Sequence, residues 1–241
     1  MTDSKPLLKG IVFDKDGVLV DFEKTWVKVL VDMTDELSGN QVALKLQLLK
    51  LAGYISEDEG FLSGSVWAAG TTQGLVDVWL PELSNYNELE LLNFINVSCL
   101  DTKAVPLHGV KPLQTMFEGL KASGLSLGIT TNDLEASAVK TMDAFGLTLH
   151  LSLICGFDSV ENPKPAADPV IAFCQVTGLE SKNIVVVGDN VHDLEMAHNA
   201  KAGLAVGVLT GNSTLEELAP YADYVLESVL DLPQLLQQQK I

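Results

Sequence analysis

The chain has 241 residues, enough for one large α/β domain or for a core domain with a smaller insertion. It is strongly acidic, with 15 basic and 32 acidic side chains and a formal net charge of −17. Because this charge repels phosphate backbones and anionic lipid surfaces, we expect neither nucleic acid nor a membrane as a partner. It also repels a small anionic substrate, so a phosphate site would need its own cation and basic residue.

The cysteines and the start of the chain favour a soluble, cytoplasmic protein. Cys99, Cys155 and Cys174 are widely spaced and form no C-x-x-C pair, so we expect buried thiols in a reducing compartment. Residues Met1 to Lys9 contain no apolar run of the kind found in secretion signals. No stretch approaches the roughly 20 apolar residues that a membrane span needs.

The first expected element is a short buried strand, Gly10 to Phe13, made of apolar residues and followed by D-K-D-G. Helical patterns then follow over Trp26 to Leu37, Gln41 to Ala52, Phe61 to Ala69, Gln73 to Leu80 and Asn87 to Leu100. No segment from Asp21 to Lys103 has a clear strand pattern. We therefore expect an all-helical insertion over residues 21–103, directly after the first strand.

From Pro106 onwards, strands alternate with helices. The expected strands are Leu125 to Ile129, Leu151 to Ile154, Ile184 to Val187, Leu204 to Val208 and Tyr224 to Val225. Helical segments separate them, and a last helix, Val229 to Gln238, closes the chain. This alternation predicts an α/β fold, a doubly wound parallel sheet built from residues 1–20 and 104–241.

Polar and charged residues follow the strands where the strands end. In chain order they are Asp14, Asp16, Thr131, Asn132, Lys164, Asp189 and Asp193. Singly, each has an ordinary structural explanation, as a turn residue, a helix cap, a rigid proline-flanked loop or a first-turn acid. Together they favour a ligand site, because in doubly wound sheets ligands bind beyond the carboxyl ends of the strands.

The carboxylates in this set predict a metal site. Asp14, Asp16 and Asp189 can supply oxygen ligands for a hard cation such as Mg²⁺, which is commonly completed by water and substrate phosphate. Asp193, one helical turn after Asp189, can bind the metal directly or through water. Lys164 adds a positive charge opposite the metal.

A phosphate would be held at the same place. The Thr131 hydroxyl and nearby backbone N–H groups can donate to phosphate oxygens. With a carboxylate as the nucleophile, this arrangement suits phosphoryl transfer.

These motifs resemble those of the haloacid dehalogenase (HAD) superfamily, and more closely its phosphoglycolate phosphatase-like branch. The family pattern is D-x-D-G-[TV]-L, a hydrophobic strand ending in Ser or Thr, a Lys, and G-D-x-x-x-D. Here the same order reads D-K-D-G-V-L, G-I-T-T-N, N-P-K-P and G-D-N-V-H-D. The resemblance covers the first strand and the chain from Pro106. It implies a Rossmann-like core with residues 21–103 as an α-helical cap that selects the substrate.

The resemblance also implies roles for individual residues. Asp14 would be the nucleophile that forms an aspartyl phosphate. Asp16 would protonate the leaving alcohol and then deprotonate the attacking water, and its backbone carbonyl would bind Mg²⁺. The remaining implied roles are phosphoryl binding by Thr131, charge neutralisation by Lys164, metal binding by Asp189 and metal support by Asp193. The second Asp favours a phosphatase over the 2-haloacid dehalogenases, which lack it. Neither Lys15 nor His192 receives a role.

Substrate contacts are predicted at Phe22 and Glu23, near the first connection to the insertion, and at Asn132. Trp26 shares a helical face with Leu30, so we expect it in the core of the cap.

The predicted function is a Mg²⁺-dependent phosphatase for a small phosphorylated metabolite, with 2-phosphoglycolate as first candidate and a sugar phosphate as the alternative. A β-phosphoglucomutase-like phosphotransferase is the rival enzyme. A receiver-like module that only accepts phosphate is the non-enzymatic rival, against which the large insertion and Asp16 both argue. The sequence leaves open whether the protein is a monomer or a homodimer.

Overall fold

Strand β1 (Gly10–Phe13) lies in the middle of a six-stranded sheet. The computed structural model describes residues 7–56, 60–100 and 102–238. The strand order is β5-β4-β1-β6-β7-β8 and every neighbouring pair is parallel. The other strands are β4 (Ser126–Thr130), β5 (Leu151–Cys155), β6 (Ile184–Gly188), β7 (Leu204–Val208) and β8 (Tyr224–Leu226). The predicted parallel, doubly wound α/β sheet is confirmed.

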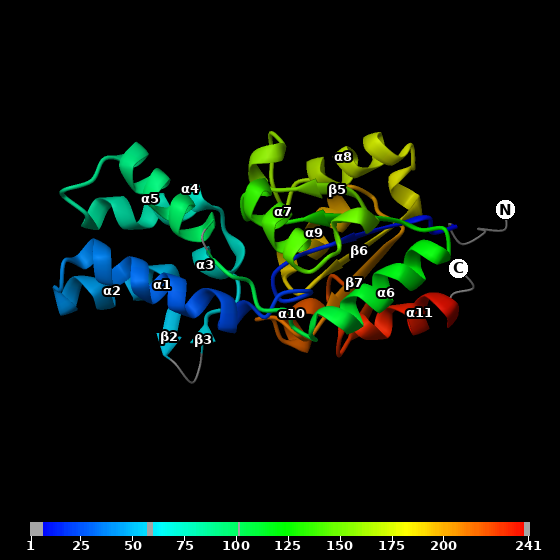
Figure 1. Cartoon of the computed structure of the whole chain (residues 1–241), viewed down its shortest axis with the longest axis horizontal. Helices are drawn as coiled ribbons and strands as arrows, with labels where there is room; N and C mark the ends of the chain where they lie inside the picture. The colour runs from blue at the N-terminus through cyan, green and yellow to red at the C-terminus, as the bar shows by residue number, and fades with distance from the viewer. Residues whose placement is uncertain (1–6, 57–59, 101, 239–241) are drawn as a thin grey trace.

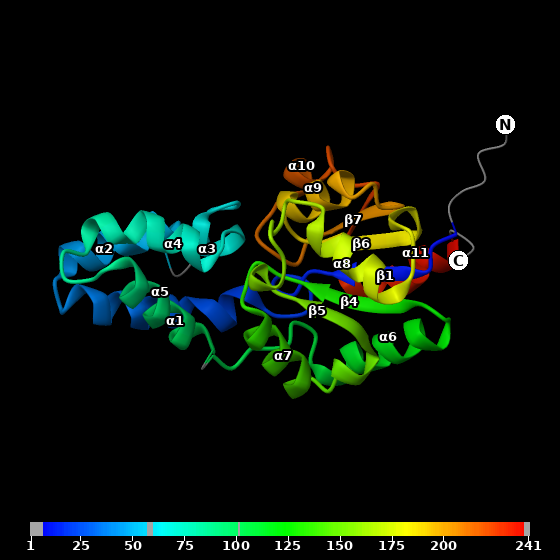
Figure 2. The same ribbon diagram turned by 90° about the horizontal axis from the view of Figure 1, so that it is seen from above.

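Helices cover both faces of the sheet (Figure 2). One face packs against α6 (Val110–Ala122), α7 (Glu135–Ala144) and α11 (Leu232–Gln238), and the other against α8 (Asp168–Thr177), α9 (Val191–Asn199) and α10 (Leu215–Leu218). Side chains of β1 alternate between the two layers: Phe13 stacks on Phe117 of α6 with ring centroids 5.2 Å apart, while Val12 joins the cluster around Phe173 of α8. Burial on both faces explains why β1 and β6 are continuous apolar runs.

The insertion forms a separate layer of helices beside the sheet (Figure 1). Its helices are α1 (Phe22–Ser38), α2 (Val42–Ala52), α3 (Val66–Ala69), α4 (Thr72–Trp79) and α5 (Glu88–Leu100). Their buried side chains form a hydrophobic cluster drawn only from the insertion. Trp79 is fully buried at its centre, and its Nε1 donates to the Leu48 carbonyl at 2.9 Å.

The expectation of an all-helical insertion is wrong in one respect, because the described residues include a short antiparallel hairpin. Strand β2 (Tyr54–Ser56) pairs with β3 (Gly60–Phe61), so Phe61 lies in a strand and not at the start of a helix. Gly53 ends α2 with φ 92°, a left-handed conformation that favours glycine and turns the chain into β2. Strands this short cannot show the alternating pattern by which a strand is recognised in a sequence.

The two connections between the sheet and the insertion lie side by side. The Asp21 N–H donates to the Val105 carbonyl at 2.8 Å, and the Val105 N–H donates to Thr25 Oγ1 at 2.9 Å. Val20 and Pro106 form an antiparallel bridge next to them. The predicted boundaries, after residue 20 and before residue 104, fall at this pair of linkers. Residues 1–6 and 239–241 of the predicted core, and 57–59 and 101 of the predicted cap, lie outside the described residues.

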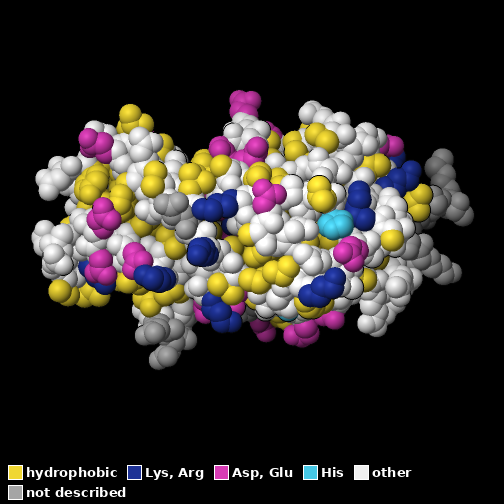
Figure 3. All heavy atoms as spheres, in the orientation of Figure 1, with side chains coloured by type: hydrophobic (Ala, Val, Ile, Leu, Met, Phe, Trp, Pro, Cys, Tyr) yellow, Lys and Arg dark blue, Asp and Glu magenta, His cyan; other side chains and the backbone are white. Residues whose placement is uncertain are grey.

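The described part of the chain contains neither a disulfide nor a membrane-spanning helix. All three cysteines are free thiols, with Cys99 and Cys155 buried. On the face drawn in Figure 3, the basic side chains are scattered among acidic and apolar ones. Within the described ranges, no helix combines the length and apolar character needed to cross a membrane.

Candidate active site

The first site residue, Asp14, extends directly from the end of β1. Its backbone N–H still donates to the Val187 carbonyl of β6 at 2.8 Å, so the neighbouring strand fixes the position of Asp14. The chain then turns at Gly17, which has φ 75°. The turn is held from β7's side, where Thr210 Oγ1 donates to the Gly17 carbonyl at 2.6 Å.

Asp193 is positioned by the start of helix α9. Asn190 is the N-cap residue, and its backbone N–H donates to Asp193 Oδ2 at 3.1 Å, which completes a capping box. The other oxygen, Oδ1, accepts a hydrogen bond from Lys164 Nζ at 2.7 Å. The same ammonium group donates to Asp14 Oδ1 at 2.5 Å. Lys164 therefore links the end of β1 to the start of α9 through two buried carboxylates.

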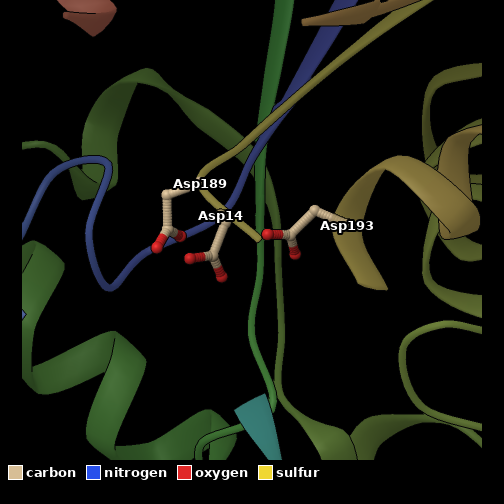
Figure 4. A group of neighbouring side chains, drawn as sticks. All are labelled: Asp14, Asp189 and Asp193. Carbon is tan, nitrogen blue, oxygen red and sulfur yellow. The ribbon is translucent and has the colours of Figure 1, made fainter. Parts of the chain in front are cut away.

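Three buried carboxylates, those of Asp14, Asp189 and Asp193, converge at this edge of the sheet (Figure 4). One oxygen from each lies within 4.8 Å of the others. The hydrogen bond described for Asp189 is long, 3.3 Å from the Asn212 N–H. The group has three acids and one lysine, Lys164, which pairs with Asp14 and Asp193, and uncompensated buried charge is costly. The donor set therefore fits a hard divalent cation such as Mg²⁺, which prefers oxygen ligands.

Asp16 is not part of this carboxylate group. Its Oδ1 accepts a hydrogen bond from Trp26 Nε1 at 2.6 Å, and its Oδ2 accepts one from Lys15 Nζ at 2.8 Å. The structure thus does not bring the Asp16 side chain to the other acids as a metal ligand. Metal binding by the Asp16 backbone carbonyl stays a prediction.

The electrostatics of the site reflect its burial. Burial raises the pKa of Asp14 to about 7, although the charge of Lys164 acts in the opposite direction. Burial, together with the charges of Asp14 and Asp193, raises the pKa of Asp189 well above its ordinary value. Burial alone would lower the pKa of Lys164, but its two carboxylate partners more than offset this and raise it. A cation among the acids would favour their ionised forms.

The raised pKa of Asp14 predicts how Mg²⁺ and pH affect the free energy of unfolding. Because the pKa of Asp14 rises from 3.8 to about 7 on folding, the native state binds more protons than the unfolded chain in that interval. In a chelator, the stability contributed by this group should therefore fall as the pH rises from about 4 to about 7, by roughly 4 kcal/mol for Asp14 alone. Saturating Mg²⁺ should reduce that fall. Thermal unfolding as a function of pH, with and without Mg²⁺, measures both effects.

The control for this experiment is the Asp189→Asn variant, which replaces one carboxylate by an uncharged amide of similar shape. We expect the Mg²⁺-dependent gain in Tm at pH 8 to be much smaller in the variant than in the wild type. If Mg²⁺ leaves the Tm of the wild type unchanged at pH 8, the three acids are not a metal site.

A cavity of about 80 Å³ lies beside these residues, between the sheet and the insertion. The predicted site residues Asp14, Thr131, Asn132 and Asp189 line it, as does Phe22 from α1. The remaining predicted contact, Glu23, is exposed and does not line the cavity.

Three polar atoms at the cavity are buried with no hydrogen-bond partner among the described residues. They are Trp67 Nε1, Asn132 Oδ1 and His192 Nδ1. The Nδ2 of Asn132 is used, because it donates to the Ala69 carbonyl of α3 at 2.9 Å. The three unpaired atoms are exceptions to the rule that buried polar groups have hydrogen-bond partners.

Sequence reasoning missed the loop after β7. Gly211 packs so closely on the Asp189 side chain that an added Cβ would overlap its carboxylate, and the same holds for Gly17. The Asn212 N–H donates to Asp189, as described above. The available signal was a glycine that follows a strand next to the centre of a doubly wound sheet.

The expectation that Trp26 belongs only to the core of the cap is also incomplete. Trp26 is 7% exposed and packs in the hydrophobic cluster of the insertion. It also lines the cavity and donates to Asp16. The indole combines an apolar ring with a polar N–H at its edge, so one side chain serves both purposes.

Comparison with known proteins identifies the family. Residues 8–201 match the family model for haloacid dehalogenase-like hydrolases. The chain therefore belongs to the haloacid dehalogenase-like hydrolase family, which confirms the resemblance and the predicted class of enzyme.

Three similar proteins show how far the likeness extends. The pyrophosphatase PpaX of Halalkalibacterium halodurans is 32% identical over 128 residues, covering 51% of this chain and 59% of that relative. The chain thus spans less than two thirds of that relative. The phosphoglycolate phosphatase of Aquifex aeolicus is 26% identical over 229 residues, covering 95% of this chain and 97% of that relative. The crystal structure of a predicted phosphoglycolate phosphatase from Haemophilus somnus 129PT matches with a TM-score of 0.71 and 22% identity, covering 95% and 98% of the two chains.

Proposed function

We propose that this protein is a Mg²⁺-dependent phosphatase that hydrolyses a small phosphorylated metabolite through an aspartyl phosphate on Asp14. The observation that carries the proposal is the convergence of Asp14, Asp189 and Asp193, two of which pair with Lys164, beside a cavity at the carboxyl edge of the sheet. The names of the relatives support the same class of reaction.

In the first half of the reaction, an oxygen of Asp14 attacks phosphorus and the ester P–O bond breaks. The leaving alkoxide takes a proton from Asp16. Lys164 keeps a positive charge at 2.5 Å from Asp14, which offsets the charge that gathers on the phosphoryl oxygens. The Thr131 hydroxyl would donate to one of these oxygens, which its position at the wall of the cavity supports.

In the second half, Asp16 takes a proton from a water molecule as that water attacks phosphorus. The bond between Asp14 and phosphorus breaks, which releases inorganic phosphate and restores the free carboxylate. Asp14, Asp189 and Asp193 would hold the Mg²⁺, which, when bound, draws electron density from the phosphoryl oxygens.

The cavity favours a small substrate. Its volume of about 80 Å³ is well below that of a pocket for a drug-sized ligand, which supports a small substrate. The polar side chains that line it, Thr131 and Asn132 among them, suit a short polar acid or alcohol. We therefore take 2-phosphoglycolate as the first candidate and a sugar phosphate as the alternative, which would need a wider opening of the cap.

We also propose that residues 21–103 act as a cap domain over a core of residues 1–20 and 104–241. The separate hydrophobic cluster of the insertion supports this division. The free thiols support a location in a reducing compartment such as the cytoplasm.

Steady-state phosphate release from p-nitrophenyl phosphate and a panel of phosphorylated metabolites tests the function. We expect release that requires Mg²⁺, stops with a chelator, and is fastest with a small phosphorylated acid. Transfer of labelled phosphate to a second sugar without release would instead support the β-phosphoglucomutase-like alternative. Label that stays on Asp14 without turnover would support a phospho-accepting module.

A further inference from the structure

We propose that Lys15 is a positioning residue, which holds the Asp16 carboxylate between Asp133 of the core and Trp26 of the cap. This inference rests on the proposed role of Asp16 in proton transfer. It assigns a role to a buried charge that neither the motifs nor the metal site explains.

The Lys15 side chain is buried, and its ammonium group is paired with two carboxylates. Its side chain has 0% exposure, and its Nζ lies 2.8 Å from Asp16 Oδ2 and 2.9 Å from Asp133 Oδ2. Burying an ammonium group is costly unless it is paired and hydrogen-bonded. Two carboxylates on one ammonium satisfy that condition, and they also tie the turn after β1 to the turn after β4.

Trp26, from helix α1 of the cap, contacts both Lys15 and Asp16. The ring centroid of Trp26 lies 5.0 Å from Lys15 Nζ, within the range of a cation–π contact. The Nε1 of the same ring donates to Asp16 Oδ1. Both oxygens of Asp16 are therefore occupied, one by a residue of the core and one by a residue of helix α1.

Asp133 is itself fixed, so the network has a rigid base. Its Oδ2 accepts a hydrogen bond from Ser137 Oγ at 2.6 Å, and its Oδ1 accepts one from the Leu134 N–H at 2.7 Å. Both donors belong to the start of α7. Displacement of Asp133 would thus require movement of that helix. Because Lys15 binds both Asp133 and Asp16, the fixed position of Asp133 also fixes the Asp16 carboxylate.

Lys15 acts through Asp16 and not on the substrate directly. Asp16 lines the cavity, whereas Lys15 does not. Lys164, in contrast, touches Asp14, the proposed nucleophile. Loss of Lys15 should therefore affect the step in which Asp16 protonates the leaving group, more than the attack on phosphorus.

The dependence on leaving group tests this prediction. p-Nitrophenolate leaves without protonation, but a simple alkoxide needs an acid. In Lys15→Met we expect kcat/KM, which reports the steps up to departure of the leaving group, to fall at least about tenfold more for an alkyl phosphate than for p-nitrophenyl phosphate, because positioned acids contribute roughly 10²- to 10⁴-fold. Equal losses for the two esters would overturn the proposal. If the wild type hydrolyses neither ester, the proposed function fails and the spectroscopic test below decides the inference.

The spectroscopic test uses the indole N–H resonances of the metal-free protein in ¹H–¹⁵N spectra. Loss of one resonance in Trp26→Phe assigns Trp26. In Lys15→Met we expect the Trp26 resonance to move and that of Trp79, which bonds within the cap, to stay. An unmoved Trp26 resonance would overturn the proposal.

A second variant covers the case in which Lys15→Met does not fold. Trp26→Phe removes the donor to Asp16 and keeps an aromatic ring near Lys15. We expect the same preference for p-nitrophenyl phosphate, with a smaller ratio. A Trp26→Phe enzyme that loses activity equally with both esters would contradict the proposed network.

Discussion

The Asp14→Asn variant is expected to release phosphate at least about 10⁴-fold more slowly than the wild type with every substrate, because it lacks the proposed nucleophile. The amide is close in shape to the carboxylate but is a poor nucleophile and carries no charge for the metal. Measurement of phosphate release under saturating Mg²⁺ gives the ratio directly. The same variant should form no acid-stable covalent phosphoenzyme adduct.

The control for this variant is its stability. Burial raises the pKa of Asp14 to about 7, so a neutral side chain at this position removes a buried charge at higher pH. We therefore expect the metal-free variant to unfold at a temperature no lower than the metal-free wild type at pH 8. Activity within a hundredfold of the wild type would show that Asp14 is not the nucleophile.

The Lys164→Met variant should lose both activity and stability. Its Nζ is the shared partner of the buried Asp14 and Asp193 carboxylates. Removal of one partner from a buried ion pair costs about 3–5 kcal/mol. Phosphate release should fall by roughly 10²- to 10³-fold, since a fixed positive charge next to the phosphoryl group is lost. Urea unfolding and steady-state kinetics measure the two effects.

The pH dependence of the Lys164→Met loss provides a further check. Without the lysine, the pKa values of the neighbouring acids rise further, so at low pH the acids are neutral and the loss is small. The destabilisation should thus grow from pH 5 to pH 8. Lys164→Arg keeps the charge and serves as the matched control. An unfolding free energy at pH 8 equal to that of the wild type would show that the ion pair contributes no stability.

Much of the α/β core domain could be predicted, because the sequence patterns that mark its strands are local. Strands buried on both faces are continuous apolar runs, and in a parallel sheet their carboxyl ends meet at one edge. Asp14, Asp189 and Lys164 could therefore be assigned to one place before any contact was known. The hairpin of β2 and β3 was missed because its strands are two and three residues long.

The residues around Asp16 could not be predicted, since their contacts join distant parts of the chain. Lys15 and Asp133 are 118 residues apart, and no spacing rule relates them. Trp26 was assigned from its helical face, but a face assignment says nothing of the indole N–H at the edge of the ring. Such contacts depend on how the cap is placed on the core.

The paired linkers at Asp21 and Val105 have a consequence for the evolution of the protein. The whole insertion leaves and re-enters the core at points joined by a 2.8 Å hydrogen bond, so it occupies the place of a short surface turn. None of the six strands of the parallel sheet lies in this segment. Recombination at this single position would exchange the proposed cap, Trp26 included, and keep Asp14, Lys164 and Asp189 in place on the sheet.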